Sequence, residues 1–270
     1  MAVSSQELFD RYKDCVGCVF VLDNKGDEHT GAAFYIGDGY FATARHVVDE
    51  KQSITLSSPT QMLTNTGSTP KRILLPSTAH ADVAIIEGQP ESIPIRHVWV
   101  GDNVKQLKEI VGGAVPLGGE TVDWLDPKLM LSKAVAFGYP PIPVTTTTGL
   151  VVVTTEVNAL VTKYNAPHQH FVVSMIPRKG FSGGPLISEY GYLLGIIIEG
   201  LQEQDQAPET GFAVAVSVDP LLDLLWEHGI KLSGENGDLL EQLWNPGFYE
   251  SEGVGFGSAS GKAELVIALS

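Results

Sequence analysis

The chain has 270 residues, of which 43% are hydrophobic and 18% are charged, and its formal net charge is −15. This length and composition can bury a sizeable core, which excludes intrinsic disorder as the default state. The negative charge opposes binding to nucleic acid, because affinity for a phosphate backbone depends largely on Lys and Arg. The 29 glycines and 16 prolines exclude a long helical bundle and favour short strands joined by many turns.

The N-terminal sequence MAVSSQELFDRYKDC lacks the basic region and apolar run of a secretory signal, and no stretch of about 18 apolar residues could cross a bilayer. We therefore expect a cytoplasmic protein with no membrane partner. The two cysteines, Cys15 and Cys18, agree with a reducing compartment. Their CxxC spacing is a weak motif, since a zinc site needs a second pair of ligands nearby. We interpret them as buried cysteines and expect no metal and no cofactor.

The predicted elements begin with a short amphipathic helix over residues 4–14, capped by Ser4, and an apolar strand over residues 18–22. A Gly-rich stretch over 112–127 is a plausible link between two β-rich halves. Near the C-terminus, Asp219-Pro220 predicts a helix with Asp219 as its N-cap and Gly229 as its stop, followed by a short helix over 235–244. Further strands are predicted over residues 32–36, 40–44, 54–56, 73–75, 83–86, 98–100, 134–137, 150–157, 171–174, 193–198 and 212–216. This pattern predicts an all-β fold, an antiparallel barrel or sandwich, rather than alternating βαβ units.

The segment KGFSGGPL places Ser182 between glycines and directly ahead of a strand. A serine nucleophile needs neighbours without side chains if backbone N–H groups are to face the oxyanion that develops on a carbonyl substrate. Serine is a poor nucleophile near neutral pH, so it also needs a base and a group that orients the base. The structural alternative is a Gly-rich turn that carries no chemistry.

Two further segments can supply the base and its partner. Asp38-Gly39 lies between apolar runs and predicts a hairpin whose second strand ends just before His46, a suitable position for a general base. Asp82 precedes an apolar strand, where its carboxylate would need a donor such as the Nδ1–H of an imidazole. Each residue also has a structural interpretation, Asp82 as a turn cap and His46 as a structural histidine. The order His46, Asp82, Ser182 within one β-rich chain favours the catalytic interpretation.

The segments TARHVV, ADVAII and GFSGGPLI, with GIIIEG (195–200) and GFAVAV (211–216), resemble the chymotrypsin/trypsin-fold serine proteases. The resemblance covers residues 15–228 and is closest to HtrA-like and related bacterial trypsin-like peptidases. It implies two antiparallel Greek-key β-barrels with the active site in the cleft between them. The predicted division is an N-terminal helix (1–17), a first barrel (18–115), a linker and second barrel (116–218), C-terminal helices (219–250) and a tail (251–270).

The resemblance also implies a role for each residue. Ser182 would attack the scissile carbonyl of a protein or peptide substrate, His46 would take and return the proton, and Asp82 would fix the imidazole tautomer. The backbone N–H groups of Gly180 and Ser182 would form the oxyanion hole. Such a serine endopeptidase works through an acyl-enzyme without a metal or an organic cofactor.

The chain departs from digestive-type members at Phe181, where those enzymes carry an aspartate that pairs with a newly cut N-terminus. We therefore expect that no N-terminal cleavage is needed and that loop ordering, a regulatory partner protein or the compartment controls activity. The segment after residue 229 is too short for the PDZ domain that HtrA-like proteins usually append, so we expect none.

No aspartate lies six residues before Ser182, where selection for Arg or Lys would place one. We expect an apolar specificity pocket that accepts small or medium aliphatic side chains. Glu199 at the rim is the exception, because its carboxylate could favour a basic residue. The residues expected to line the pocket are Ile176, Pro177, Ile198, Glu199, Gly200, Phe212 and Ala213.

Two other functions stay open at this point. A pseudoprotease could keep the double barrel as a module that binds a peptide by strand addition, although the intact trio argues against this. An esterase could use the same acyl chemistry.

Overall fold

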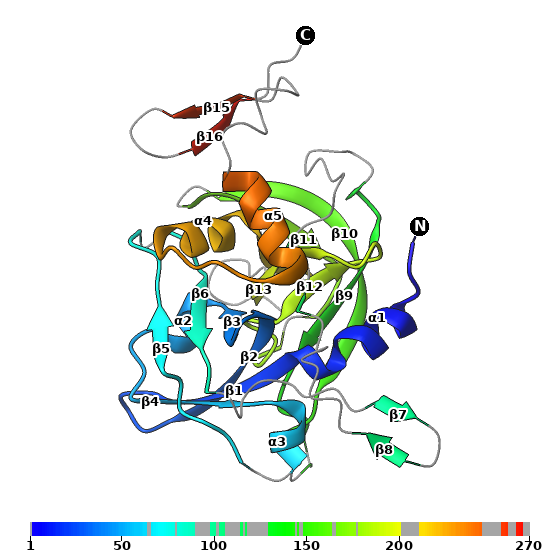
Figure 1. Cartoon of the computed structure of the whole chain (residues 1–270). Helices are drawn as coiled ribbons and strands as arrows, with labels where there is room; N and C mark the ends of the chain where they lie inside the picture. Colours follow the sequence, from blue (N-terminus) through cyan, green and yellow to red (C-terminus); the bar gives the residue numbers. More distant parts are fainter. Residues whose placement is uncertain are drawn as a thin grey trace.

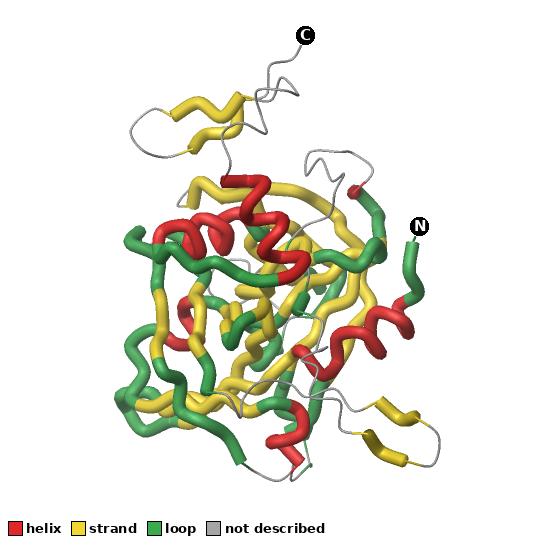
Figure 2. The backbone as a smooth tube through the Cα atoms, in the orientation of Figure 1, coloured by secondary structure: helices red, strands yellow, loops and turns green. Residues whose placement is uncertain are grey.

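The structure, a computed structural model, describes most of the chain. The described residues are 2–63, 66–78, 80–89, 98–100, 103–105, 114–115, 117, 129–143, 145, 148–163, 166–176, 178–200, 211–244, 255–258 and 263–266. The predicted link over 112–127 lies largely outside these ranges. Strands dominate the architecture, with helices at its periphery (Figures 1 and 2). None of the helices in these ranges is long and apolar enough to cross a membrane.

The N-terminal helix α1 (Ser5–Tyr12) forms as predicted, because Ser4 and Glu7 make a reciprocal capping box. A 3₁₀ turn, η1 (Lys13–Cys15), leads directly into strand β1 (Val16–Leu22). Helix α1 packs beside strand β9 (Lys133–Gly138) of the second half of the chain and buries Leu8 and Tyr12 (Figure 1). The N-terminal helix therefore lies on the second half, while the strand that follows it belongs to the first.

The first half is an antiparallel sheet in the order β4-β1-β2-β3-β6-β5, a half-barrel. Asp38 and Gly39 both have positive φ at the turn between β2 and β3, which confirms the predicted hairpin. Two short helices, α2 (Arg45–Val48) and α3 (Pro59–Leu63), connect its strands. The remaining strands of this sheet are β2 (Glu28–Gly37), β3 (Tyr40–Thr43), β4 (Ser53–Ser57), β5 (Arg72–Leu74) and β6 (Ala84–Glu87).

The second half is a closed antiparallel barrel in the order β10-β11-β14-β13-β12-β9. Its strands are β9 (Lys133–Gly138), β10 (Val151–Lys163), β11 (Ala166–Val173), β12 (Pro185–Ser188), β13 (Leu193–Gly200) and β14 (Ala213–Ser217). Two small two-stranded sheets pair β7 (Val98–Val100) with β8 (Asn103–Lys105), and β15 (Gly255–Ser258) with β16 (Ala263–Val266). The half-barrel and the closed barrel together make a double-barrel chymotrypsin fold, as predicted.

One large apolar cluster joins the two halves. It contains Phe34 and Ile85 from the first sheet, Phe137 from the second barrel, and Leu221 from the C-terminal helix α4 (Asp219–Glu227). A smaller cluster lies inside the closed barrel. Because the larger cluster crosses the boundary between the halves, hydrophobic burial fixes them against each other and defines the surface between them.

The predicted N-cap of helix α4 is wrong by one residue. Val218 is the cap, and Asp219 is already helical. The carboxylate of Asp219 accepts a hydrogen bond from the Ser217 hydroxyl at 2.7 Å, so it is engaged outside the helix. Gly229 ends the helix with φ 61°, as predicted.

Helix α5 (Gly234–Trp244) is fastened to the first half by the buried side chain of Asn236. The Asn236 amide oxygen accepts from the Leu117 N–H at 2.9 Å. Its nitrogen donates to the carbonyls of Ile36 at 2.9 Å and Val115 at 3.1 Å. One side chain thus satisfies three buried backbone groups and ties the connecting segment to the end of β2.

Replacing Asn236 by Ala should lower the free energy of unfolding by about 2–4 kcal/mol, because it leaves these three buried groups without partners. The control is Asn24→Ala, since the exposed Asn24 amide donates only to the Glu50 carbonyl. That change should cost about 0.5 kcal/mol or less in urea unfolding. Equal losses in the two variants would contradict the anchoring role of Asn236.

Candidate active site

His46 and Asp82 lie next to the ends of two neighbouring strands of the first sheet. Strand β3 ends just before helix α2, which carries His46, and Asp82 lies just ahead of β6. Strands β3 and β6 pair in antiparallel register, with Thr43 opposite Ala84. The end of one strand therefore lies beside the start of the other, which brings the imidazole and the carboxylate together.

Both oxygens of the Asp82 carboxylate accept hydrogen bonds from His46. The backbone N–H of His46 donates to Oδ1 at 3.0 Å, and Nδ1 lies 2.8 Å from Oδ2. An ionised carboxylate can only accept, so Nδ1 carries a proton and Nε2 of the neutral ring is left as an acceptor. The His46 side chain is 47% exposed.

The surroundings of Asp82 keep it ionised. Burial alone would raise the pKa of Asp82, but the hydrogen bonds from His46 and the charges of His46 and Lys163 lower this pKa below its ordinary value. Lys163 comes from the far end of β10, and its own pKa is lowered by burial, against the opposing effect of Asp82. Burial, helped by the charge of Lys163, also lowers the pKa of His170. The positive charge of Lys163, in the second barrel, therefore helps to keep the Asp82 carboxylate ionised.

Ser182 is held at the boundary between the two halves. Its carbonyl accepts a hydrogen bond from the Ala32 N–H of strand β2 at 2.8 Å. Its hydroxyl donates to the Ile198 carbonyl at 3.3 Å, and no hydrogen bond joins it to His46 within the described ranges. In the same ranges, no hydrogen bond is formed by the N–H groups of Gly180 and Ser182.

Gly183 explains how the two halves approach so closely at this point. Its φ is +85°, and a Cβ there would collide with the Ala32 carbonyl and the Thr43 hydroxyl. It would also lie 3.1 Å from the amide nitrogen of Ala44, which is two residues before His46. Gly183, the residue after Ser182, thus packs against the backbone that leads into His46. This packing brings the side chains of Ser182 and His46 into one region.

Phe181 anchors the other side of the Ser182 loop. Its side chain is buried in the apolar cluster of the closed barrel, with Phe171, Leu186 and Leu194. Hydrophobic packing therefore occupies the position where digestive-type proteases use an aspartate. The carbonyl of Gly180, the residue before Phe181, accepts a hydrogen bond from the Tyr139 N–H at 2.9 Å. This bond also holds the Ser182 loop.

The residues predicted to line a specificity pocket lie at adjacent strand ends. In the barrel, Ala213 pairs with Val173 of β11 and with Gly200 of β13. Ile176 is 53% exposed and Phe212 is 37% exposed, whereas Ile198 and Ala213 are buried. Pro177 lies outside the described residues, as do the side chain of Glu199 and the surroundings of Gly200.

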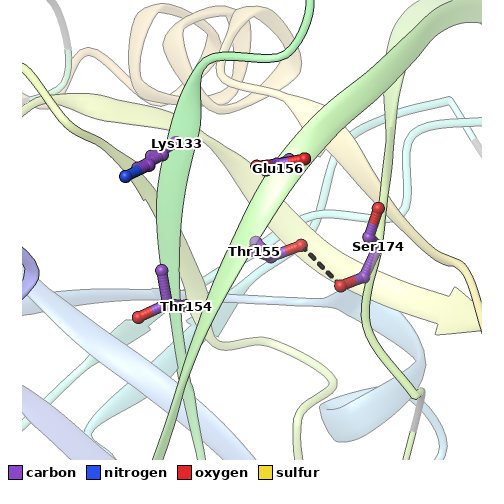
Figure 3. Close-up of a pocket in the computed structure, with 5 residues that line it drawn as sticks. All are labelled: Lys133, Thr154, Thr155, Glu156 and Ser174. Carbon is purple, nitrogen blue, oxygen red and sulfur yellow. Dashed lines mark hydrogen bonds between the residues drawn. The ribbon is translucent and has the colours of Figure 1, made fainter.

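A separate shallow pocket lies on the closed barrel, between β9, β10 and the segment after β11 (Figure 3). Figure 3 shows the hydrogen bond that the Thr155 hydroxyl donates to the Ser174 carbonyl, at 2.9 Å. None of the three predicted catalytic residues lines this pocket. The lining residues are Lys133, Thr154, Thr155, Glu156 and Ser174.

Both cysteines are buried and neither forms a disulfide, which agrees with their interpretation as buried residues. Burial raises the pKa of Cys18 to about 12, so its thiolate is not formed near neutral pH. Among the residues that the structure describes, no group of three or more His, Cys, Asp or Glu side chains could hold a metal ion.

Comparison with known proteins places the chain in a family. The trypsin-like peptidase domain matches residues 30–196, and the chain belongs to this family. The HtrA-type protease AlgW, solved with a tripeptide, is 18% identical with a TM-score of 0.60; the match covers 84% of this chain and 64% of AlgW. No curated protein sequence matches significantly.

Two other solved structures share the fold. The Rv3671c protease from M. tuberculosis in its active form is 14% identical with a TM-score of 0.58, over 87% of this chain and 92% of that one. The serine endoprotease from Yersinia pestis is 17% identical with a TM-score of 0.57, over 84% and 67% of the two chains. At these identities, the likeness concerns the fold.

Three residues near the site were not found by sequence reasoning: Ala32, Tyr139 and Lys163. Ala32 and Tyr139 contribute backbone groups, which leave no signature in residue type. Lys163 is 81 residues from Asp82, and only barrel closure brings it near the carboxylate.

The lowered pKa of Asp82 predicts how this carboxylate contributes to stability. Because the folded chain binds the Asp82 proton less readily than the unfolded chain, the contribution is full above the ordinary carboxyl pKa of about 4. It is lost as the pH falls through the lower pKa of the folded state. The difference in unfolding free energy between wild type and Asp82→Asn should therefore shrink as the pH falls below about 4.

Urea unfolding at a series of pH values measures this difference. Lys163→Met should move the loss to higher pH, because it removes a positive charge that lowers the Asp82 pKa. A difference that stays constant across the range would refute the electrostatic description of Asp82.

Proposed function

We propose that the protein is a serine endopeptidase that hydrolyses peptide bonds of a protein substrate through Ser182, His46 and Asp82. The observation that carries the proposal is the paired contact of His46 with Asp82, in which one carboxylate accepts both the backbone N–H and Nδ1. This contact orients the ring and leaves Nε2 free to accept a proton. Membership of the trypsin-like peptidase family supports the same activity.

In the proposed reaction, Ser182 Oγ bonds to the carbonyl carbon of the scissile peptide while its proton passes to Nε2 of His46. Collapse of the tetrahedral intermediate breaks the C–N bond, and His46 gives the proton to the leaving amine. Water then attacks the acyl-enzyme and gives a proton to His46, which returns it to Ser182 Oγ as the acid is released. The Ser182 hydroxyl must first leave the Ile198 carbonyl.

The N–H groups of Gly180 and Ser182 are the proposed donors to the oxyanion. Their lack of hydrogen-bond acceptors within the described ranges supports this role, since donors that are already engaged could not stabilise new charge. Asp82 stays ionised throughout and stabilises the imidazolium of His46.

The proposed substrate carries a small or medium aliphatic side chain on the residue before the scissile bond. The partly exposed Ile176 and Phe212, next to the buried Ile198 and Ala213, support an apolar site. An aliphatic side chain that leaves water here gains about 1.5–3 kcal/mol from burial. A regulatory partner protein stays part of the proposal.

The activity is tested by labelling with a fluorophosphonate probe and by turnover of a peptide library. Wild type should be labelled at Ser182, with cleavage after aliphatic residues. Ser182→Ala should abolish labelling, and His46→Ala should slow it by roughly a thousandfold or more, because the base is lost.

The same experiment separates the alternatives. Absence of labelling under all activating conditions would favour a peptide-binding module. Turnover of simple esters without cleavage of any library peptide would favour an esterase. Asp23→Ala serves as the control, since Asp23 lies in the β1–β2 turn, outside the proposed catalytic residues, and should leave labelling unchanged.

A further inference from the structure

Tyr139 connects the loop that precedes Ser182 to the first sheet. It follows strand β9 directly and is only 1% exposed. Its N–H donates to the Gly180 carbonyl at 2.9 Å, and its hydroxyl donates to the Val16 carbonyl of β1 at 2.7 Å. Its own carbonyl accepts from the Thr30 hydroxyl of β2 at 3.3 Å. One residue therefore bonds the Gly180 loop with its backbone and the first sheet with its side chain.

Gly180 rests directly on the backbone of Tyr139. Its φ is +97°, and a Cβ there would collide with the Tyr139 carbonyl. Because the peptide after Gly180 is held by the Tyr139 N–H, a shift of the Tyr139 backbone would shift Gly180 with it. A donor to an oxyanion must be correctly placed before the charge develops, so a small displacement of Gly180 would weaken its contribution.

The Tyr139 hydroxyl is suited to fixing this backbone. The ring is enclosed in the apolar cluster that joins the two halves, and the hydroxyl reaches the carbonyl of the first residue of β1. Burial raises the pKa of the Tyr139 phenol, so the hydroxyl keeps its proton and remains a donor near neutral pH.

We propose that Tyr139 is a positioning residue: its hydroxyl bond to Val16 holds the Gly180 loop so that the N–H groups of Gly180 and Ser182 converge on the substrate carbonyl. This inference rests on the proposed function. It assigns to the junction of β1 and β9 the task that a newly formed N-terminus performs in digestive-type proteases.

The chain offers a matched control in Tyr12. Tyr12 is 2% exposed, and its hydroxyl donates to a backbone carbonyl, that of Gly191, at 2.6 Å. Tyr12→Phe therefore removes the same chemical group from the same kind of environment. Its acceptor lies in the turn between β12 and β13, so the change does not touch the backbone that carries Gly180.

The test compares Tyr139→Phe with Tyr12→Phe in the full chain. Tyr139→Phe should reduce kcat and the rate of fluorophosphonate labelling by roughly tenfold or more, with KM changed less than about twofold, because a transition-state donor is displaced. Both changes should lower the thermal midpoint of unfolding by a similar amount, because each removes one buried hydrogen bond. Tyr12→Phe should nevertheless leave kcat within about twofold of wild type. Equal kcat values in the two variants would overturn the inference.

A second readout does not depend on activity. The backbone amide at position 139 bonds to the Gly180 carbonyl. In Tyr139→Phe, its hydrogen exchange should be roughly tenfold faster than in wild type, and in Tyr12→Phe its exchange rate should be unchanged. If Tyr139→Phe fails to fold, Thr30→Val removes the hydroxyl bond to the Tyr139 carbonyl and should change exchange and kcat in the same directions. Unaltered exchange in the folded variant refutes the positioning role. If the exchange rates of the variants differ from wild type as predicted, but the fluorophosphonate probe never labels the wild-type protein, the proposed function alone is refuted.

Discussion

The hydrogen bond from the Ala32 N–H to the Ser182 carbonyl joins a strand of the first sheet to the loop of the second barrel. The backbone around it is packed so closely that only glycine fits at position 183. Ser182 is therefore positioned relative to β2 by main-chain atoms. Because β2 pairs with β3, and β3 leads into His46, the same sheet that bonds Ser182 also carries His46, the proposed base. A displacement at this contact would separate the two groups.

The site is divided so that each half supplies what its architecture can hold rigidly. The first sheet holds His46 against Asp82 through the pairing of β3 with β6. The closed barrel holds the Ser182 loop through the buried Phe181. Cross-connections then fix the halves: the Ala32–Ser182 bond, the bond from Tyr139 to Val16, and the charge of Lys163 near Asp82.

Local sequence patterns predicted those features that depend on short segments. Asp38-Gly39 specifies the β2–β3 hairpin because both positions adopt positive φ. The Ser4 capping box specifies the start of α1, and the run around Ser182 specifies its loop. The predicted contact between His46 and Asp82 is present in the structure, while their catalytic roles stay a proposal.

The features that sequence reasoning missed depend on distant pairs. Asn236 satisfies groups at positions 36, 115 and 117, and nothing in the residues near it indicates those partners. The position of Tyr139 directly after a strand does not distinguish it in the sequence. Its proposed positioning role depends on the Val16 carbonyl, which lies within hydrogen-bond distance of its hydroxyl only in the folded chain. Asp219 was predicted wrongly for the opposite reason, because the error arose from a local pattern. That pattern predicts an N-cap, but the carboxylate accepts a hydrogen bond from the nearby Ser217 hydroxyl.

The central claim is that main-chain contacts between the halves preassemble Ser182 with its oxyanion donors. A crystal structure of the protein after reaction with a phosphonate inhibitor tests it most directly. The expected result is phosphonylated Ser182 Oγ, with the phosphoryl oxygen within hydrogen-bond distance of the N–H groups of Gly180 and Ser182. The Ala32–Ser182 bond should persist. An adduct in which that bond is broken and the Gly180 loop is rebuilt would contradict preassembly.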